Sequence, residues 1–171
     1  MFKKILLILM IFLNFTACNQ QKLQISKLSI QNFEIHKFMG LWYEVAYIPN
    51  SFQNIHKNGQ YEYFIDKNKH IILQKFLQTD SGKAVNSEDE INFIWTQKQG
   101  ALEIQSFPKQ IQNIVKIDAN YQYAMIFGET TDELYILSRT KTLPEPIKMV
   151  YLNYAKSKEI DINKIIWTTQ E

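Results

Sequence analysis

The sequence predicts an all-β protein, an eight-stranded antiparallel up-and-down barrel with one C-terminal α-helix packed on its outside. Turn-forming clusters recur at close and fairly even spacing, and runs rich in aromatic and β-branched residues fill the gaps between them. No helical periodicity occurs before residue 143. Eight strands of such a meander can close on themselves, which removes the exposed edges of an open sheet.

The chain of 171 residues is long enough for one domain with a sizeable core. Its start carries Lys3 and Lys4, an apolar run from Ile5 to Leu13, and a small residue, Ala17. A positive segment followed by a short apolar one is typical of an export signal, because a membrane-spanning helix needs about twenty apolar residues. We therefore expect three segments: a signal peptide at 1–17, a polar tether at 18–32 and a barrel at 33–171.

Cys18 is the single cysteine of the chain, so no intramolecular disulfide can form. The stretch Phe15-Thr16-Ala17-Cys18 resembles the lipobox of bacterial lipoproteins, in which the cysteine is acylated, palmitate being a typical acyl group, and becomes the first mature residue. The resemblance implies a lipidated Cys18, followed by Asn19, in a protein of the outer membrane that faces the periplasm. An ordinary secretion signal with an incidental cysteine is the alternative.

Charge and composition exclude several functions. Removing residues 1–17 takes away two lysines and leaves 17 basic and 17 acidic residues, so nucleic-acid binding has no electrostatic support. His36, His56 and His70 are scattered over a linker, a loop and a turn, where we expect them at the surface, and none has a metal-ligand partner at short spacing. With no nucleophile motif and no glycine-rich loop, the sequence predicts neither an enzyme nor a cofactor nor a bound metal.

Two segments frame the expected barrel. The strand from Trp42 to Ile48 follows Gly40, and its alternation places Trp42, Glu44, Ala46 and Ile48 on one face. Near the other end, a strand at 134–140 is apolar on both faces, as a barrel wall covered by a helix would be. The helix itself is expected after Thr142-Leu143-Pro144-Glu145, which has the form of a capping box, and a final strand is expected at 163–169.

Together these segments resemble the lipocalins, and in particular the lipidated lipocalins of the bacterial outer membrane. The resemblance rests on Gly40 and Trp42, on Leu134-Tyr135-Ile136-Leu137-Ser138-Arg139-Thr140, and on the helix and the lipobox. It covers residues 38–169. It implies that Arg139, the only arginine of the chain, stacks on Trp42 and closes the barrel floor, because a planar guanidinium stacks on indole as an ammonium cannot.

The same resemblance assigns a set of residues to the barrel interior. Matching strand by strand implies that the cavity is lined by Tyr61, Tyr63, Ile65, Ile91, Phe93, Leu102, Ile104, Tyr123, Met125 and Phe127, with Glu44 as a further candidate. Such a lining suits a long apolar molecule with one polar end.

The implied function is the binding, storage or transport of lipids such as fatty acids and lysophospholipids at the outer membrane. Two alternatives stay open. The first is an envelope lipoprotein with a filled barrel, since Tyr61 would narrow the pocket. The second is a lipocalin-type enzyme that acts on a hydrophobic substrate, in which Glu44 or a cavity tyrosine would serve as acid or base.

Overall fold

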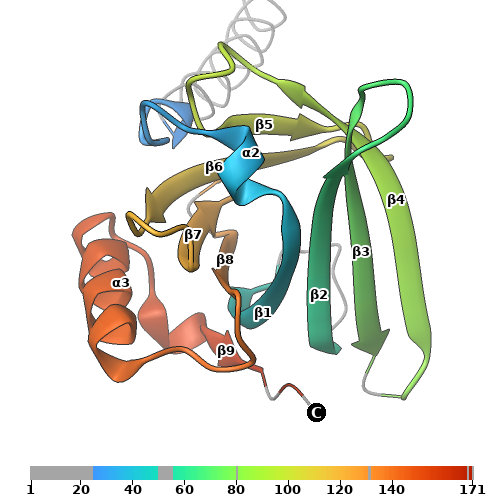
Figure 1. The fold of residues 1–171 in the computed structure, drawn as a ribbon. Coiled ribbons are helices and arrows are strands. Elements are labelled where there is room, and N and C mark those ends of the chain that lie inside the picture. The colour runs from blue at the N-terminus through green and yellow to red at the C-terminus, as the bar shows by residue number, and fades with distance from the viewer. Residues whose placement is uncertain (1–24, 50–55, 80, 131, 169, 171) are drawn as a thin grey trace, which may run out of the picture.

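The computed structural model describes residues 25–49, 56–79, 81–130, 132–168 and 170, and it contains the predicted barrel (Figure 1). Eight antiparallel strands follow one another around the barrel, and β1 pairs with both β8 and β2, which closes it. The strands are β1 (Gly40–Ile48), β2 (His56–Ile65), β3 (Ile71–Thr79), β4 (Ala84–Phe93), β5 (Ala101–Ile104), β6 (Gln110–Ile117), β7 (Tyr123–Phe127) and β8 (Leu134–Ser138). The predicted fold class is confirmed.

Smaller elements flank the barrel. The short helix α2 (Ile35–Phe38) precedes β1, and the helix α3 (Glu145–Ser157) packs outside the wall near β7 and β8 (Figure 1). After α3 come the 3₁₀ turn η1 (Ile162–Lys164) and a short ninth strand, β9 (Ile166–Trp167). The predicted capping box does not form: α3 begins after Pro144 with no side-chain cap. None of the helices within the described part of the chain is long and apolar enough to cross a membrane.

Strand β1 changes partner along one of its edges. Its first half, Gly40 to Tyr43, pairs with β2, whereas Ala46 and Tyr47 pair with β9 on the same edge. The chain beyond β9 bridges the seam where β1 and β2 part: the Gln170 side chain donates to the carbonyl of Glu44 (2.6 Å) and to that of Gly59 (3.4 Å). Gln170 therefore links β1 to β2 where their own pairing has ended.

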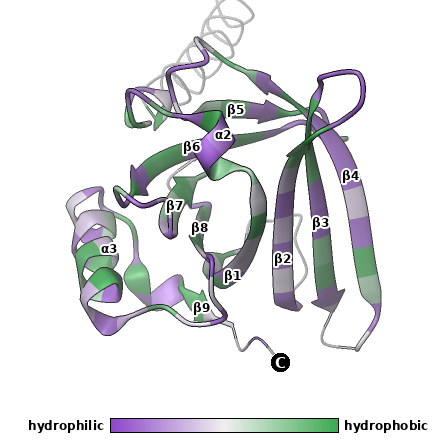
Figure 2. Ribbon diagram, viewed as in Figure 1, coloured by the Kyte–Doolittle hydropathy of each residue, from purple (hydrophilic) through white to green (hydrophobic). Residues whose placement is uncertain are grey.

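Two hydrophobic clusters hold the fold together. One fills the barrel around Phe38, Trp42 and Tyr63, and the other lies between the barrel wall and α3. Strand β8 is buried along its whole length because it faces both clusters, while β4 carries mostly polar, exposed residues (Figure 2). A strand that is covered on both faces is expected to be apolar at every position.

The expectation that β7 points Tyr123, Met125 and Phe127 into the barrel is wrong. These side chains belong to the cluster under α3: the Tyr151 hydroxyl donates to the Tyr123 carbonyl (2.8 Å), and the ring of Phe127 stacks on that of Tyr154 with centroids 6.1 Å apart. The residues of β7 that enter the interior cluster are Ala124 and Ile126. Because both faces of β7 are apolar, hydrophobicity could not tell inside from outside.

An irregularity in β1 also changes a predicted face. The pairing register with β8 shifts between Glu44 and Ala46, which marks a β-bulge. Beyond the bulge, Tyr47 points inward, while Ala46 and Ile48 join the cluster under α3. The expectation that Ala46 and Ile48 share a face with Trp42 is therefore wrong.

The new placement of Met125 predicts the effect of a larger side chain there. Met125→Trp should destabilise the protein by about 1–3 kcal/mol, because the site under α3 is fully buried and overpacking forces neighbouring side chains apart. Denaturant unfolding measures the loss, and Met149→Trp on the exposed face of α3 is the matched control. A Met125→Trp protein as stable as this control would contradict the packing of α3 on β7.

The segment 25–32 is not a free tether. Ile25, Ser26 and Ser29 are buried, and the amide of Ile30 donates to the carbonyl of Ile114 on β6 (2.8 Å). Residues 18–24, and with them Cys18, lie outside the described residues. Within the described residues, the stretch 25–32 thus packs on the barrel instead of hanging free as a tether.

Candidate functional site

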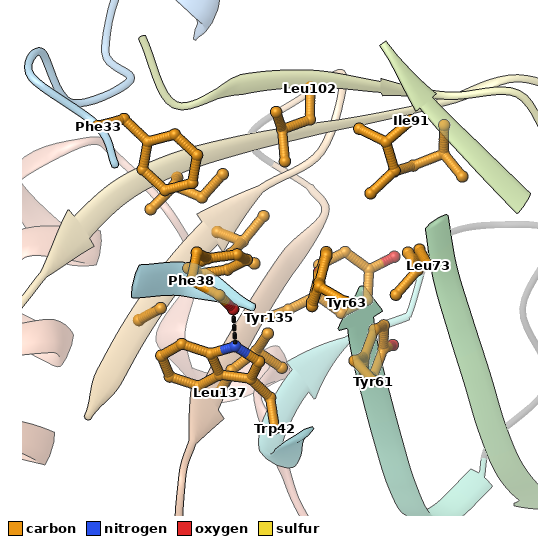
Figure 3. Close-up of a cluster of buried hydrophobic side chains, with 14 of the residues drawn as sticks. Phe33, Phe38, Trp42, Tyr61, Tyr63, Leu73, Ile91, Leu102, Tyr135 and Leu137 are labelled. Carbon is orange, nitrogen blue, oxygen red and sulfur yellow. Dashed lines mark hydrogen bonds between the residues drawn. The ribbon is translucent and has the colours of Figure 1, made fainter. Parts of the chain in front are cut away.

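The floor of the barrel is built from α2 and the start of β1. Phe38, at the end of α2, lies between Trp42 and Tyr63, with ring centroids 4.9 Å and 4.8 Å away. The indole Nε1 of Trp42 donates to the carbonyl of Phe38 (2.8 Å), which fixes the helix across this end of the barrel (Figure 3). All three rings are fully buried, so this end of the barrel is solid.

Arg139 seals the floor from outside. Its Cζ lies 3.8 Å from the centre of the Trp42 ring, the geometry of a stacked cation–π pair. The guanidinium also donates to five backbone carbonyls, those of Lys37, Phe38, Met39, Leu41 and Tyr121. Burial lowers the pKa of Arg139 to about 10, and the group stays charged at neutral pH.

Gly40 permits this arrangement. Its φ of +91° lies in the left-handed region, which side chains other than hydrogen rarely tolerate, and a Cβ there would approach Nη1 of Arg139 to 3.5 Å. The residues Gly40, Trp42 and Arg139 thus meet at one point of the closed end, as the resemblance implied.

Above the floor, a buried polar cluster lies beside the seam between β1 and β2. The carboxylate of Glu44 is bonded through Oε1 to Nε2 of His56 (2.7 Å), and through Oε2 it accepts from the Tyr61 hydroxyl (2.6 Å). The ring of Tyr47 stacks on the His56 imidazole with centroids 4.2 Å apart. Burial and the nearby Glu44 carboxylate raise the pKa of Tyr61 well above its usual value, so its hydroxyl remains a proton donor.

The expectation of a surface position is wrong for His56, which is 4% exposed, while His36 and His70 are exposed as expected. Glu44 has no exposed surface and faces the interior. The close approach of β2 needs Gly59, because a Cβ there would come within 3.0 Å of Glu44. No group of three potential metal ligands occurs among the residues that the structure describes.

Two side-chain hydrogen bonds cross the interior at mid-height. The Tyr63 hydroxyl donates to Oε1 of Gln112 (2.8 Å), and Nζ of Lys75 donates to Oε1 of Gln110 (2.6 Å). These bonds join β2 and β3 to β6, which are not neighbours in the sheet, so they span the lumen. Burial raises the pKa of Tyr63, which keeps its hydroxyl protonated.

A small cavity of about 10 Å³ lies beside this polar layer, room for about one water molecule. It is lined by Tyr61, Lys75, Gln110, Ile111, Gln112, Glu133 and Tyr135. A separate hollow of about 340 Å³ lies on the outer wall, where Ser26 meets the outward-facing residues of β5 and β6.

The predicted cavity residues separate into three groups. Those in or against the interior cluster are Tyr61, Tyr63, Ile91, Phe93, Leu102 and Ile104, to which Glu44 is added through its bond to Tyr61. Tyr123, Met125 and Phe127 lie outside under α3. Ile65 ends β2 and is 43% exposed, so its expected place in the cavity is wrong.

The polar members of the interior were missed in the sequence. Lys75 shares the inward face of β3 with Leu73 and Leu77, and Gln110 and Gln112 share that of β6 with Ile114. Lys75 falls at a position where the alternation of the strand predicts an apolar, inward-facing residue. This could have marked it as a site residue, since a buried lysine is rare unless it has a function or a partner.

A closed eight-stranded barrel with a tryptophan–arginine floor and a helix outside its wall defines a class of small β-barrel binding proteins. The family model of the lipocalin-like domain matches residues 33–170, and the chain therefore belongs to this family.

Among curated relatives, the outer membrane lipoprotein Blc of Escherichia coli K12 is 28% identical over 144 residues, which cover 82% of this chain and 81% of that protein. Apolipoprotein D of Rattus norvegicus is 34% identical over 149 residues, covering 79% of this chain and 76% of the relative. Among solved structures, insecticyanin from Manduca sexta superposes with a TM-score of 0.67 at 21% identity and 82% coverage of both chains, which shows a shared fold.

Proposed function

We propose that this protein binds small lipids inside its barrel and stores or transports them at the outer membrane, to which an acylated Cys18 anchors it on the periplasmic side. Membership of the lipocalin-like family supports the binding of small hydrophobic molecules, and the name of the Escherichia coli relative supports the location.

The observation that carries the proposal is the polar layer inside the barrel. Side chains that only filled a core would be mostly apolar, because burying a charged group such as that of Lys75 costs free energy unless the charge is paired. Here Lys75, Gln110 and Gln112 lie above an apolar floor and beside a cavity. A lumen with aromatic walls and a polar layer suits a molecule that has both an apolar chain and a polar end.

The small volume of that cavity favours the alternative of a filled barrel. A lipid chain needs far more than 10 Å³, so its entry requires the Lys75–Gln110 hydrogen bond to open. Both are long, flexible side chains that can move without unfolding the wall. The solid floor of Phe38, Trp42 and Tyr63 then confines a ligand to the half of the barrel that faces away from Arg139.

The buried Glu44–His56–Tyr61 cluster supports a structural role better than a catalytic one. Its groups are at most 4% exposed, and the carboxylate already bonds both partners. A general acid or base must reach a substrate proton, and this one holds β1 and β2 together instead.

Native mass spectrometry of the protein extracted from its own cells tests the proposed function. We expect a lipid to co-purify and to be displaced by an added fluorescent fatty acid with 1:1 stoichiometry. A barrel that carries no lipid and takes up none from micelles would establish the filled-barrel alternative.

Lipidation predicts a mass and a location for the mature protein. Mass spectrometry should find an N-terminus at Cys18 with more than one acyl chain, since a single chain holds a protein to a membrane only weakly. Cys18→Ser should move the protein from the membrane fraction to the soluble periplasm. An unmodified Cys18 in the mature wild-type protein would contradict the anchor.

A further inference from the structure

We propose that Lys75 binds the acidic headgroup of the ligand in the middle of the barrel, so that the lipid enters head first. This inference rests on the proposed function and names the residue that decides its ligand class. The chemistry recognised is a singly charged anion on an apolar chain, either a carboxylate or a phosphodiester.

The first support is the position of Lys75 itself. The residue is 9% exposed, and its hydrogen bond to Gln110 crosses the lumen between strands that are not neighbours. No carboxylate in the described part of the chain lies within ion-pair distance of its ammonium. Among the residues that the structure describes, the ammonium is held by this one neutral amide, which engages one of its three donor hydrogens.

The second support is that a bound anion would give the Lys75 ammonium the charge partner that its surroundings do not supply. Buried charges are normally paired, because removing them from water is costly. Desolvation lowers the pKa of Lys75, and the charges of Asp89 and Glu44 act in the opposite direction without contacting it. A ligand anion at Nζ would form the short charge-assisted hydrogen bonds that these distant carboxylates do not.

The other groups around the cavity narrow the kind of headgroup. Glu44 is bonded to His56 and Tyr61, and Glu133 lines the cavity as a second negative group. Their repulsion disfavours a doubly charged phosphate monoester and leaves room for one negative charge next to Lys75. The Gln112 amide and the Tyr61 hydroxyl lie at the same cavity and make its lining polar.

The direction in which the lipid lies follows from the residues near the open end of the barrel. The end of the barrel opposite Arg139 holds the β3–β4 turn, and the last inward pair before it is Leu77 with Val85. Both are apolar, and Val85 is 42% exposed, so an alkyl chain can leave the barrel along them. The headgroup then lies at the level of Lys75, and the tail points to the mouth.

The test compares ligands that share a chain and differ in charge. Fluorescent-probe displacement from the full-length protein would give affinities for palmitic acid, 1-hexadecanol and palmitoyl lysophosphatidylethanolamine. We expect wild-type protein to prefer the acid to the alcohol roughly tenfold or more, the effect of charged hydrogen bonds. Lys75→Met should bring that ratio close to one while alcohol binding persists, and Lys67→Met, a surface charge at the closed end, should leave it unchanged.

The lysophospholipid measurement tells a carboxylate from a phosphodiester ligand. If Lys75→Met lowers the affinity for the lysophospholipid as it lowers that for palmitic acid, the phosphodiester uses the same site. A wild-type protein that binds acid and alcohol equally, or a Lys75→Met protein that keeps the preference, would overturn the inference while leaving lipid binding intact. A wild-type protein that binds none of the three would overturn the proposed function and this inference with it. Melting curves of each variant show that the comparison is made on folded protein.

Discussion

Replacing Glu44 with alanine is expected to lower the free energy of unfolding by about 3–5 kcal/mol, because it deletes a buried carboxylate with two side-chain hydrogen bonds, each worth about 1.5–3 kcal/mol. The substitution leaves the His56 ring nitrogen and the Tyr61 hydroxyl inside the barrel without their shared acceptor. It also opens a void where β2 approaches at Gly59. Urea denaturation of the purified protein measures the change.

Two further variants show whether the loss comes from the cluster. Glu62→Ala removes a carboxylate from the outward face of β2 and should change stability by less than about 0.5 kcal/mol. Glu44→Gln keeps the volume and one acceptor oxygen, so its cost should fall between the two. If Glu44→Ala were as stable as Glu62→Ala, the hydrogen bonds to His56 and Tyr61 would not support the fold.

Arg139→Lys is expected to cost about 2–4 kcal/mol even though it keeps the charge. An ammonium can reach only some of the five carbonyls that the guanidinium bonds, each such bond contributing about 1 kcal/mol, and it cannot stack on Trp42 as a planar group does. Thermal and denaturant unfolding measure the loss. Lipid affinity of the folded protein should not change, because Arg139 lies at the end of the barrel away from Lys75.

The control is a cation over an exposed ring. Nζ of Lys148 lies 4.4 Å from the centre of the Trp167 ring, which is 40% exposed, and Lys148→Met should cost no more than about 1 kcal/mol. Equal losses in Arg139→Lys and Lys148→Met would mean that the floor is held by its rings alone.

The sequence predicted the elements whose signals are local. Turn residues mark where each strand ends, and the final strand after α3 returns to β1 as expected. The floor could also be predicted, because the family resemblance implied that Arg139 stacks on Trp42. The place of Phe38 over Trp42 could not, because it depends on how α2 crosses the end of the barrel.

The predictions that were wrong depend on alternation across irregular or doubly covered strands. On β7 both faces are apolar, so Met125 and Ala124 could exchange sides without changing the pattern. At the bulge between Glu44 and Ala46 the alternation itself is interrupted. His56 follows a segment with no regular period, and its burial depends on contacts with Glu44 and Tyr47 that sequence alternation does not reveal.

The partner change along β1 has a consequence for biogenesis. Thr168 and Gln170 donate hydrogen bonds to the backbone carbonyl of Glu44, which lies 124 and 126 positions before them in the sequence. Contacts of such long range form slowly, and an unpaired strand edge is a template for association with other chains. The second half of β1 therefore keeps one edge unpaired until β9 and the residues after it dock, and until then that edge is open to pairing with other chains.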